Sequence, residues 1–393
     1  MKKALSLIFA FVLTLTPTLF PSTTPTFAKI TPKPNWENKF VSTSGMVDCP
    51  NPEIASGNNR FGIVFDEKWD GNYEIYFSLL DQNGNKIGGN LRITNDPGDS
   101  RDPVIGFDGR NFGVFWYDSP AGENRGIYFV AISPKGELKI GPLRINDVNA
   151  DGVHPSVIWN NASNEYGVTW WDGRNGGAYF GRVNRQGKTI LETQVSTMPA
   201  NAYYRPRIGT SGKEYAISWE QQVPCPPGNC PEMAFARVSK NGTKIGNDSI
   251  ITNYGATRIK SIVWNGKEWG LLVGISHYAK LLRISKNGTV IQDPISLGDI
   301  MMSQAEMAWN GKNYGISWMD PQWVTAENSL NGEVAFQTFN SLGKPLSDVT
   351  RVSNGTGPSW SLSSLIWTGK KFALTWVENL YQPDQEIRFA QGK

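Results

Sequence analysis

The chain has 393 residues, among them 15 tryptophans and three cysteines, and its formal net charge is +3. The lysines are scattered through turns instead of forming a run, so the charge does not support nucleic-acid binding. Three cysteines in so long a chain exclude a fold that depends on a disulfide framework.

The first 28 residues predict a secretory signal peptide. Lys2 and Lys3 precede an apolar stretch, and the small-residue exit ends at Ala28, after which we expect cleavage. The apolar stretch is short and contains Pro17, so a permanent membrane span is not expected, and no later segment is apolar enough to form one. The short, Lys-Lys-led signal is typical of bacteria and predicts a secreted, periplasmic or cell-envelope protein.

An internal repeat of about fifty residues predicts the fold. An aromatic residue followed by Gly or Ala recurs at Phe61, Phe112, Tyr166, Tyr215, Trp269, Tyr314 and Phe372. Four residues beyond each stand Phe65, Trp116, Trp170, Trp219, Val273, Trp318 and Trp376. Even spacing of large residues, with small or polar residues between them, indicates a β-strand.

Each copy continues with another strand, the third of its unit, and a glycine turn. This third strand ends at Phe77, Phe129, Phe180, Phe235, Leu281 and Phe336, and a Gly follows seven residues later at Gly84, Gly136, Gly187, Gly242, Gly288 and Gly343. Gly supplies the positive φ of such a turn. With a further strand after the turn and an opening strand before the aromatic pair, each unit has four antiparallel strands, which is a propeller blade.

The two ends of the repeat array predict that the ring is closed by an N-terminal strand. The seventh unit ends after its third strand, near Phe389, whereas Phe40 to Thr43 read as a fourth strand that precedes the first unit. We therefore expect an all-β, seven-bladed β-propeller at residues 39–393, preceded by the signal peptide at 1–28 and a short tether at 29–38. We expect a monomer.

These repeats resemble sialidase-like and kelch-like propellers at the level of architecture. The glycine doublet of kelch repeats and the Ser-x-Asp-x-Gly-x-Thr-Trp box of sialidases do not recur at regular positions. The resemblance therefore implies a fold, and it assigns no catalytic residue.

One face of the ring collects acidic and basic side chains. Acids follow the second strand of six units, at Asp66, Asp118, Asp172, Glu220, Asp320 and Glu378, and the loops that lead into the opening strands carry Arg101, Asp102, His154, Arg205 and Arg258. Antiparallel neighbours bring both sets to the same face. They predict a polar ligand site, because Arg binds carboxylate or sulfate in a bidentate manner and Asp accepts from sugar hydroxyls. The alternative is that the recurring acids brace the blades.

Two functions remain open at this stage. The absence of a motif that places a nucleophile, a base or a metal favours a non-catalytic binding or scaffold module for a glycan or an envelope protein. A sialidase-like glycoside hydrolase or lyase would use Arg101, Arg205 and Arg258 together with an activated tyrosine, for which Tyr203 and Tyr204 are the neighbours of Arg205. That reading requires the three arginines to converge.

A weak calcium site and one disulfide are further predictions. Asp147, Asn149 and Asp151 match the first half of a calcium loop, but the twelfth position is Ile158 instead of Glu, so any bound calcium ion would be structural. The alternative is an ordinary turn. Cys225 and Cys230 bracket a turn-forming segment and are expected to pair, which leaves Cys49 odd.

Most tryptophans are expected in the core, because they occupy the fixed repeat position. Trp69, Trp171, Trp323 and Trp360 fall outside the repeat position and are candidates for exposed stacking platforms. The loops after the second strands vary most in length, so we expect a ligand to contact the loops at 118–125, 220–231 and 320–332.

Overall fold

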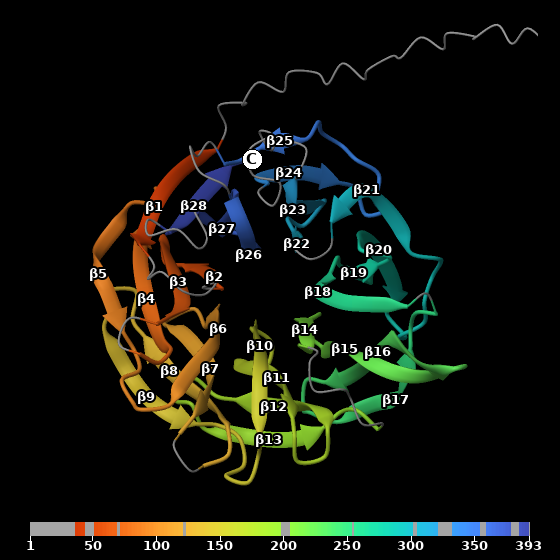
Figure 1. Cartoon of the computed structure of the whole chain (residues 1–393), viewed down its shortest axis with the longest axis horizontal. Helices are drawn as coiled ribbons and strands as arrows, with labels where there is room; N and C mark the ends of the chain where they lie inside the picture. The colour runs from red at the N-terminus through yellow and green to blue at the C-terminus, as the bar shows by residue number, and fades with distance from the viewer. Residues whose placement is uncertain are drawn as a thin grey trace, which may run out of the picture. The chain divides into compact units, whose positions relative to one another are not determined.

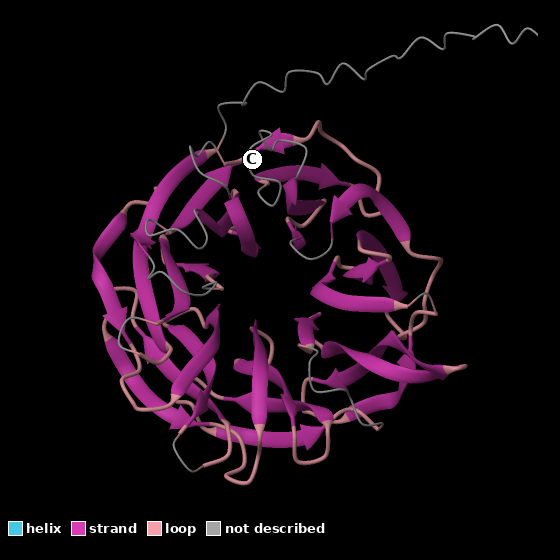
Figure 2. Cartoon of the chain, viewed as in Figure 1, coloured by secondary structure: helices cyan, strands magenta, loops and turns pink. Residues whose placement is uncertain are grey.

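The computed structural model describes residues 36–43, 51–68, 71–120, 123–197, 205–253, 255–301, 305–320, 332–353, 359–378 and 385–392. All of its strands belong to one compact unit, Pro32–Lys393. They form seven four-stranded antiparallel sheets arranged as blades around an axis, which confirms the predicted propeller (Figure 1). Figure 2 shows strands and connecting loops in the described segments, and no helix suited to crossing a membrane occurs there.

Within a blade the first strand lies nearest the axis and the fourth forms the outer rim (Figure 1). The first four blades contain β2 (Glu53–Gly57), β3 (Arg60–Glu67), β4 (Glu74–Asp81), β5 (Lys86–Arg92); β6 (Asp99–Phe107), β7 (Phe112–Ser119), β8 (Gly126–Ile132), β9 (Leu138–Arg144); β10 (Gly152–Asn160), β11 (Glu165–Asp172), β12 (Gly177–Val183), β13 (Thr189–Gln194); β14 (Arg207–Thr210), β15 (Glu214–Cys225), β16 (Gly228–Ser239) and β17 (Lys244–Ile250). The last three contain β18 (Ala256–Trp264), β19 (Glu268–Ile275), β20 (Tyr278–Ser285), β21 (Ile295–Met301); β22 (Ala305–Trp309), β23 (Tyr314–Asp320), β24 (Glu333–Phe339), β25 (Thr350–Arg351); β26 (Ser359–Trp367), β27 (Phe372–Glu378), β28 (Glu386–Gly392) and β1 (Glu37–Thr43).

The N-terminal strand closes the ring, as predicted. β1 pairs antiparallel with β28, in a register that runs from Glu37 opposite Gln391 to Thr43 opposite Glu386. The strand begins at Glu37, two residues before the predicted domain boundary. Val41 is fully buried among residues of the first and last blades, so the closure is also a packing contact.

The aromatic-Gly pairs of the repeat are contacts between neighbouring blades. A Cβ atom placed on Gly167 would lie 2.5 Å from Cε1 of Tyr215, the corresponding aromatic residue of the next blade. One placed on Gly113 would lie 2.4 Å from Oη of Tyr166. The glycine therefore makes room for the ring of the following blade, which explains why a small residue follows the aromatic one.

The turn glycines also behave as the repeat predicts. Gly84, Gly136, Gly187, Gly242, Gly288 and Gly343 all have positive φ, between 75° and 91°. L-residues rarely adopt this conformation, so Gly is the residue that allows the tight turn between the third and fourth strands.

Candidate functional site

Three consecutive blades place a polar side chain at the same position, directly before the Pro of the first strand. These residues are Asp102, His154 and Arg205. Asp102 and His154 adopt φ values of 51° and 54° and lie where the register of β6 and β10 shifts. Left-handed backbone at a non-glycine residue costs about 1–3 kcal/mol and persists only where the surroundings hold it, commonly at functional sites.

The three side chains contact one another through the Asp102 carboxylate. Nδ1 of His154 forms a short hydrogen bond with Oδ2 of Asp102, and Nη2 of Arg205 donates to Oδ1 of Asp102 over 3.0 Å. This arrangement leaves Nε2 of His154 as the ring nitrogen that can meet a ligand. The side chains of His154 and Arg205 are 22% and 42% exposed, so solvent reaches the group.

A second ion pair adjoins the first. Nε of Arg101 lies 3.6 Å from Oδ2 of Asp66, and the Arg101 guanidinium stacks 3.8 Å from the ring centroid of Tyr73. The backbone N–H of Asp102 donates to the same Asp66 oxygen over 3.3 Å. We call Asp66, Arg101, Asp102, His154 and Arg205 the mouth cluster. The last four lie near the start of a first strand, and Asp66 lies near the end of β3.

The two acids of the mouth cluster have opposite pKa shifts. Burial, and next the charge of Asp102, raise the pKa of Asp66 to about 6. For Asp102 burial opposes ionisation, but Arg205 and the hydrogen-bonded His154 outweigh it and lower the pKa to about 2. Burial, and then Asp102, raise the pKa of nearby Tyr117 to about 12, so this tyrosine keeps its proton at neutral pH.

The predicted convergence of three arginines is not what the described residues show. Arg101 and Arg205 both lie close enough to Asp102 to lower its pKa, and each is paired with a carboxylate. Arg258 is exposed, and no contact within the described part of the chain joins it to the mouth cluster. Tyr203 and Tyr204 lie outside the described residues, as do Trp69, Trp323 and Cys49, and the side chain of Trp360.

A deeper layer of charged residues was missed by the sequence analysis. Glu53, Arg207, Lys260 and Glu306 come from the first strands of four blades and line a cavity of about 160 Å³, the channel cavity. Each of the four side chains is half-buried. Glu53 and Arg207 occupy the position after the strand-opening Pro, as do Val104 and Ser156, which also line the cavity. This fixed offset was the available signal.

Three of the six recurring acids each accept a hydrogen bond from the tryptophan two residues earlier in the same strand. The indole N–H groups of Trp116, Trp170 and Trp376 donate to the acids two residues later, Asp118, Asp172 and Glu378, over 3.1, 3.2 and 3.1 Å. In the fourth blade Gln221 takes this place for Trp219. These bonds satisfy indole groups that would otherwise be buried without a partner.

Two residues predicted to bind ligand are part of the interior. Asp172 is fully buried and accepts hydrogen bonds from Trp170 and Arg174. Trp171 is 8% exposed and packs in a hydrophobic cluster, so the prediction of an exposed platform is wrong for it. In a propeller both faces of an inner sheet are covered by neighbouring blades, so leaving the repeat position does not expose a side chain. Asp320 ends β23 and is half-buried.

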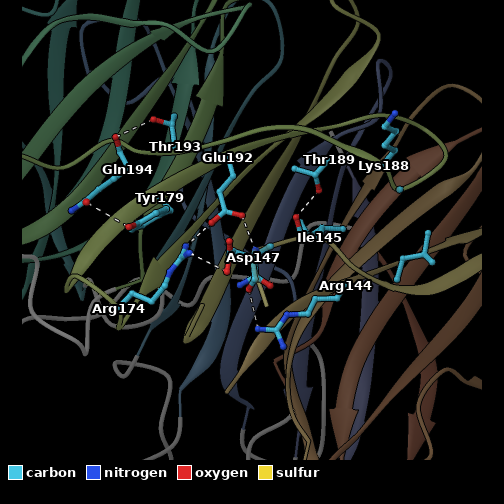
Figure 3. Close-up of a pocket in the computed structure, with 13 residues that line it drawn as sticks. Arg144, Ile145, Asp147, Arg174, Tyr179, Lys188, Thr189, Glu192, Thr193 and Gln194 are labelled. Carbon is cyan, nitrogen blue, oxygen red and sulfur yellow. Dashed lines mark hydrogen bonds and ion pairs between the residues drawn. The ribbon is translucent and has the colours of Figure 1, made fainter. Parts of the chain in front are cut away.

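The predicted calcium loop borders a groove of about 720 Å³ between the outer strands of the second and third blades (Figure 3). Arg125 donates to both carboxylate oxygens of Asp151, over 2.6 and 2.7 Å. Arg174 lies between Glu192 at 2.5 Å and Asp147 at 3.6 Å. The carboxylates that would bind calcium are therefore paired with arginines. Among the described residues there is no cluster suited to a metal ion. Calcium binding by Asp147, Asn149 and Asp151 stays a prediction.

The segment expected as an irregular loop at 220–231 is a regular ribbon. β15 and β16 pair from Glu214 opposite Ser239 to Cys225 opposite Gly228. Cys225 and Cys230 form a disulfide near the tip, with Cα atoms 5.6 Å apart. β14 and β17 pair only with the inner part of the hairpin, so the outer part extends beyond its sheet.

The sequence matches no protein-family model and no curated protein sequence. Among solved structures, a puromycin-hydrolysing peptidase of Mycobacterium tuberculosis aligns with 91% of this chain at 10% identity and a TM-score of 0.52, and the alignment spans 56% of that peptidase. A neuraminidase-like protein from a flat-faced bat isolate of Peru aligns over 91% of this chain and 93% of its own, at 10% identity and a TM-score of 0.48. An α-L-arabinanase mutant of Cellvibrio cellulosa aligns over 63% and 96%, at 14% identity and a TM-score of 0.37. At such identities the similarity concerns the fold alone: the chain is a seven-bladed β-propeller.

Proposed function

We propose that this protein is a non-catalytic binding propeller of the cell exterior or envelope, and that the mouth cluster binds a hydroxyl-rich ligand, a glycan. The observation that carries the proposal is the convergence of Asp102, His154 and Arg205 from equivalent positions of three blades, two of them in left-handed backbone. Backbone strain that recurs at one repeat position is better explained by a binding site than by a need of the fold.

The chemistry of the mouth cluster suits sugar hydroxyls. Asp102 is ionised at neutral pH and accepts hydrogen bonds, Arg205 donates them, and the second nitrogen of His154 can donate or accept. Arg101 and Arg205 already form ion pairs with carboxylates, so their charges are not available in full to bind an acidic ligand. A neutral or mixed glycan therefore fits better than a strongly anionic one. An envelope protein is the alternative partner.

A glycan array followed by isothermal titration of the best ligand tests the proposal. Substitution His154→Ala should weaken binding at least tenfold, since it removes a ligand-facing group and frees Asp102, and it should leave the melting temperature within a few degrees of the parent. Arg110→Ala, an exposed change at another turn, is the matched control. Negative glycan arrays together with binding to an envelope protein would move the ligand class to protein.

A hydrolase is a second candidate, and the raised pKa of Asp66 favours it. A carboxyl group with a pKa near 6 is suited to protonate a leaving group at neutral pH. Tyr117, however, keeps its proton and is no ready nucleophile. Measurable glycoside hydrolysis that is lost in Asp66→Asn and retained in Arg110→Ala would replace the binding proposal with catalysis.

A further inference from the structure

The channel cavity is lined by four charged side chains that come from the first strands of four blades. Arg207 and Lys260 enter it from β14 and β18, and Glu53 and Glu306 from β2 and β22. Charged groups in a confined cavity are costly unless they are paired or meet a ligand. The pairing among these four side chains is incomplete.

Arg207 and Lys260 retain unused donors. The Arg207 guanidinium donates from Nε to the carbonyl oxygen of Lys260 over 3.1 Å, and its two terminal amino groups have no hydrogen bond among the described residues. Nζ of Lys260 lies 3.7 Å from Oε1 of Glu306, which is longer than a hydrogen bond. Glu306 accepts instead from the Ser261 hydroxyl at 3.1 Å. The cavity thus offers donors from two cations.

The charges in the cavity favour an anion over a cation. With both acids ionised, Glu53 and Glu306 balance Arg207 and Lys260. Burial, and next the charge of Glu306, raise the pKa of Glu53 to about 7, so near neutrality Glu53 is partly protonated and no longer fully balances the cations. Burial also raises the pKa of Glu306 and lowers the pKa values of Lys260 and Arg207, an effect that the Glu306 charge opposes at both cations. Glu53 is surrounded by Glu306 of β22, Arg207 of β14 and Lys260 of β18, and Ser364 of β26 forms a hydrogen bond to it. The neighbouring strand β6 contributes only Val104 and Ile105 to the cavity lining.

We infer that the channel cavity is a site for one small monovalent anion, of the size of acetate or chloride, held between Arg207 and Lys260 and taken up together with a proton. The proton goes to the Glu53 carboxylate, so that ligand and proton enter as a neutral pair. A volume of about 160 Å³ is large enough to admit acetate. This site is separate from the glycan site proposed at the mouth cluster.

Isothermal titration of the full chain with sodium acetate tests the inference. The protein is kept at constant ionic strength in HEPES, or in Tris brought to pH with a bulky sulfonic acid, so that no other small anion is present. Comparing heats in two buffers of different ionisation enthalpy gives the number of protons taken up. We expect uptake of up to one proton per acetate above pH 7, and affinity falling by up to about tenfold for each pH unit there.

Four variants test whether acetate binds in the channel cavity and not elsewhere on the protein. Arg207→Gln should weaken acetate binding by about tenfold or more, because a charge-assisted donor is lost, while Arg258→Gln, an exposed change on β18, should not. Glu53→Gln mimics the protonated acid and should bind acetate without proton uptake or pH dependence. His154→Ala should keep acetate binding while losing the glycan, so the two proposals fail independently.

Some outcomes would overturn the inference. They are the absence of acetate binding to the folded parent, an unchanged pH dependence in Glu53→Gln, or stabilisation by sodium or calcium ions in place of acetate. If circular dichroism shows that Arg207→Gln is unfolded, Lys260→Met replaces it, with the same expected loss and the same contrary result.

Discussion

The Thr375 hydroxyl donates a 3.0 Å hydrogen bond to the carbonyl oxygen of Pro52, joining two residues that are 323 positions apart. Both lie where the first strand of the first blade meets the last blade, and Thr375 is fully buried. The bond therefore belongs to the closure of the ring, together with the pairing of β1 and β28.

Substitution Thr375→Val should destabilise the protein by about 1–2 kcal/mol, because it leaves a buried carbonyl oxygen without its donor while it preserves the shape of the side chain. Urea denaturation measures this change. Thr338→Val is the control, since the Thr338 hydroxyl bonds an exposed serine. An equal effect of the two substitutions would contradict the role given to the Pro52 bond.

Deletion of residues 39–55 should prevent stable folding, because it removes most of β1 and the start of β2 from two neighbouring blades. Removal of residues 1–34 should leave folding intact. Circular dichroism and thermal melting distinguish the two truncations. A chain lacking 39–55 that melts cooperatively at the parent temperature would refute closure by the N-terminal strand.

Substitution Gly167→Ala should cost about 1–3 kcal/mol, since the added methyl group would overlap the ring of Tyr215 in the next blade. The measurement is again the free energy of unfolding. Gly89→Ala serves as the control, because a Cβ atom at Gly89 would meet no atom within 4 Å. Equal stability of both variants would show that Tyr215 can move aside without loss.

Substitution Glu53→Gln should change how stability depends on pH. Between pH 4.5 and about 7 the folded Glu53 retains a proton that the unfolded chain has released, so the stability of the parent falls as pH rises through this window. Gln removes that fall. The free energy of unfolding of the variant should therefore exceed that of the parent by up to about 3 kcal/mol at pH 8 and should equal it at pH 4. Denaturant titrations at the two pH values, with Glu123→Gln as the exposed control, provide the comparison. A constant difference at both pH values would contradict the raised pKa.

Substitution Asp102→Asn should weaken glycan binding by about tenfold or more. It keeps the size of the side chain but removes the charge that holds Arg205 and His154 together. Titration calorimetry measures the loss, and Glu123→Gln, on the loop between β7 and β8, should bind as the parent does. Retained affinity in Asp102→Asn would place the ligand elsewhere on the ring.

The blades and their order were predictable because each repeats the same local chemistry: Gly84 and its equivalents for the turn, Trp170 and its equivalents for the core. Contacts between residues of different blades were harder to predict from the sequence. Asp102 and His154 were recognised as candidates, but their mutual hydrogen bond joins positions 52 residues apart. Trp171 shows the main limit, because alternation along a strand does not separate inside from outside where both faces of a sheet are covered. Glu53 and Arg207 were overlooked because single charged residues at strand starts resemble solvent-exposed ones.

The packing of one blade's glycine against the next blade's aromatic ring makes the ring directional. Each blade provides a gap on one side and a ring on the other, so a blade is matched to its successor and its predecessor by different surfaces. At two junctions Ala takes the place of the glycine: Ala216 shares a hydrophobic cluster with Trp269 of the following blade, and Ala373 shares one with Phe61. A blade that is duplicated, removed or exchanged would therefore meet mismatched seams at both sides, and the number of blades can change only if small and aromatic residues change together at each new junction.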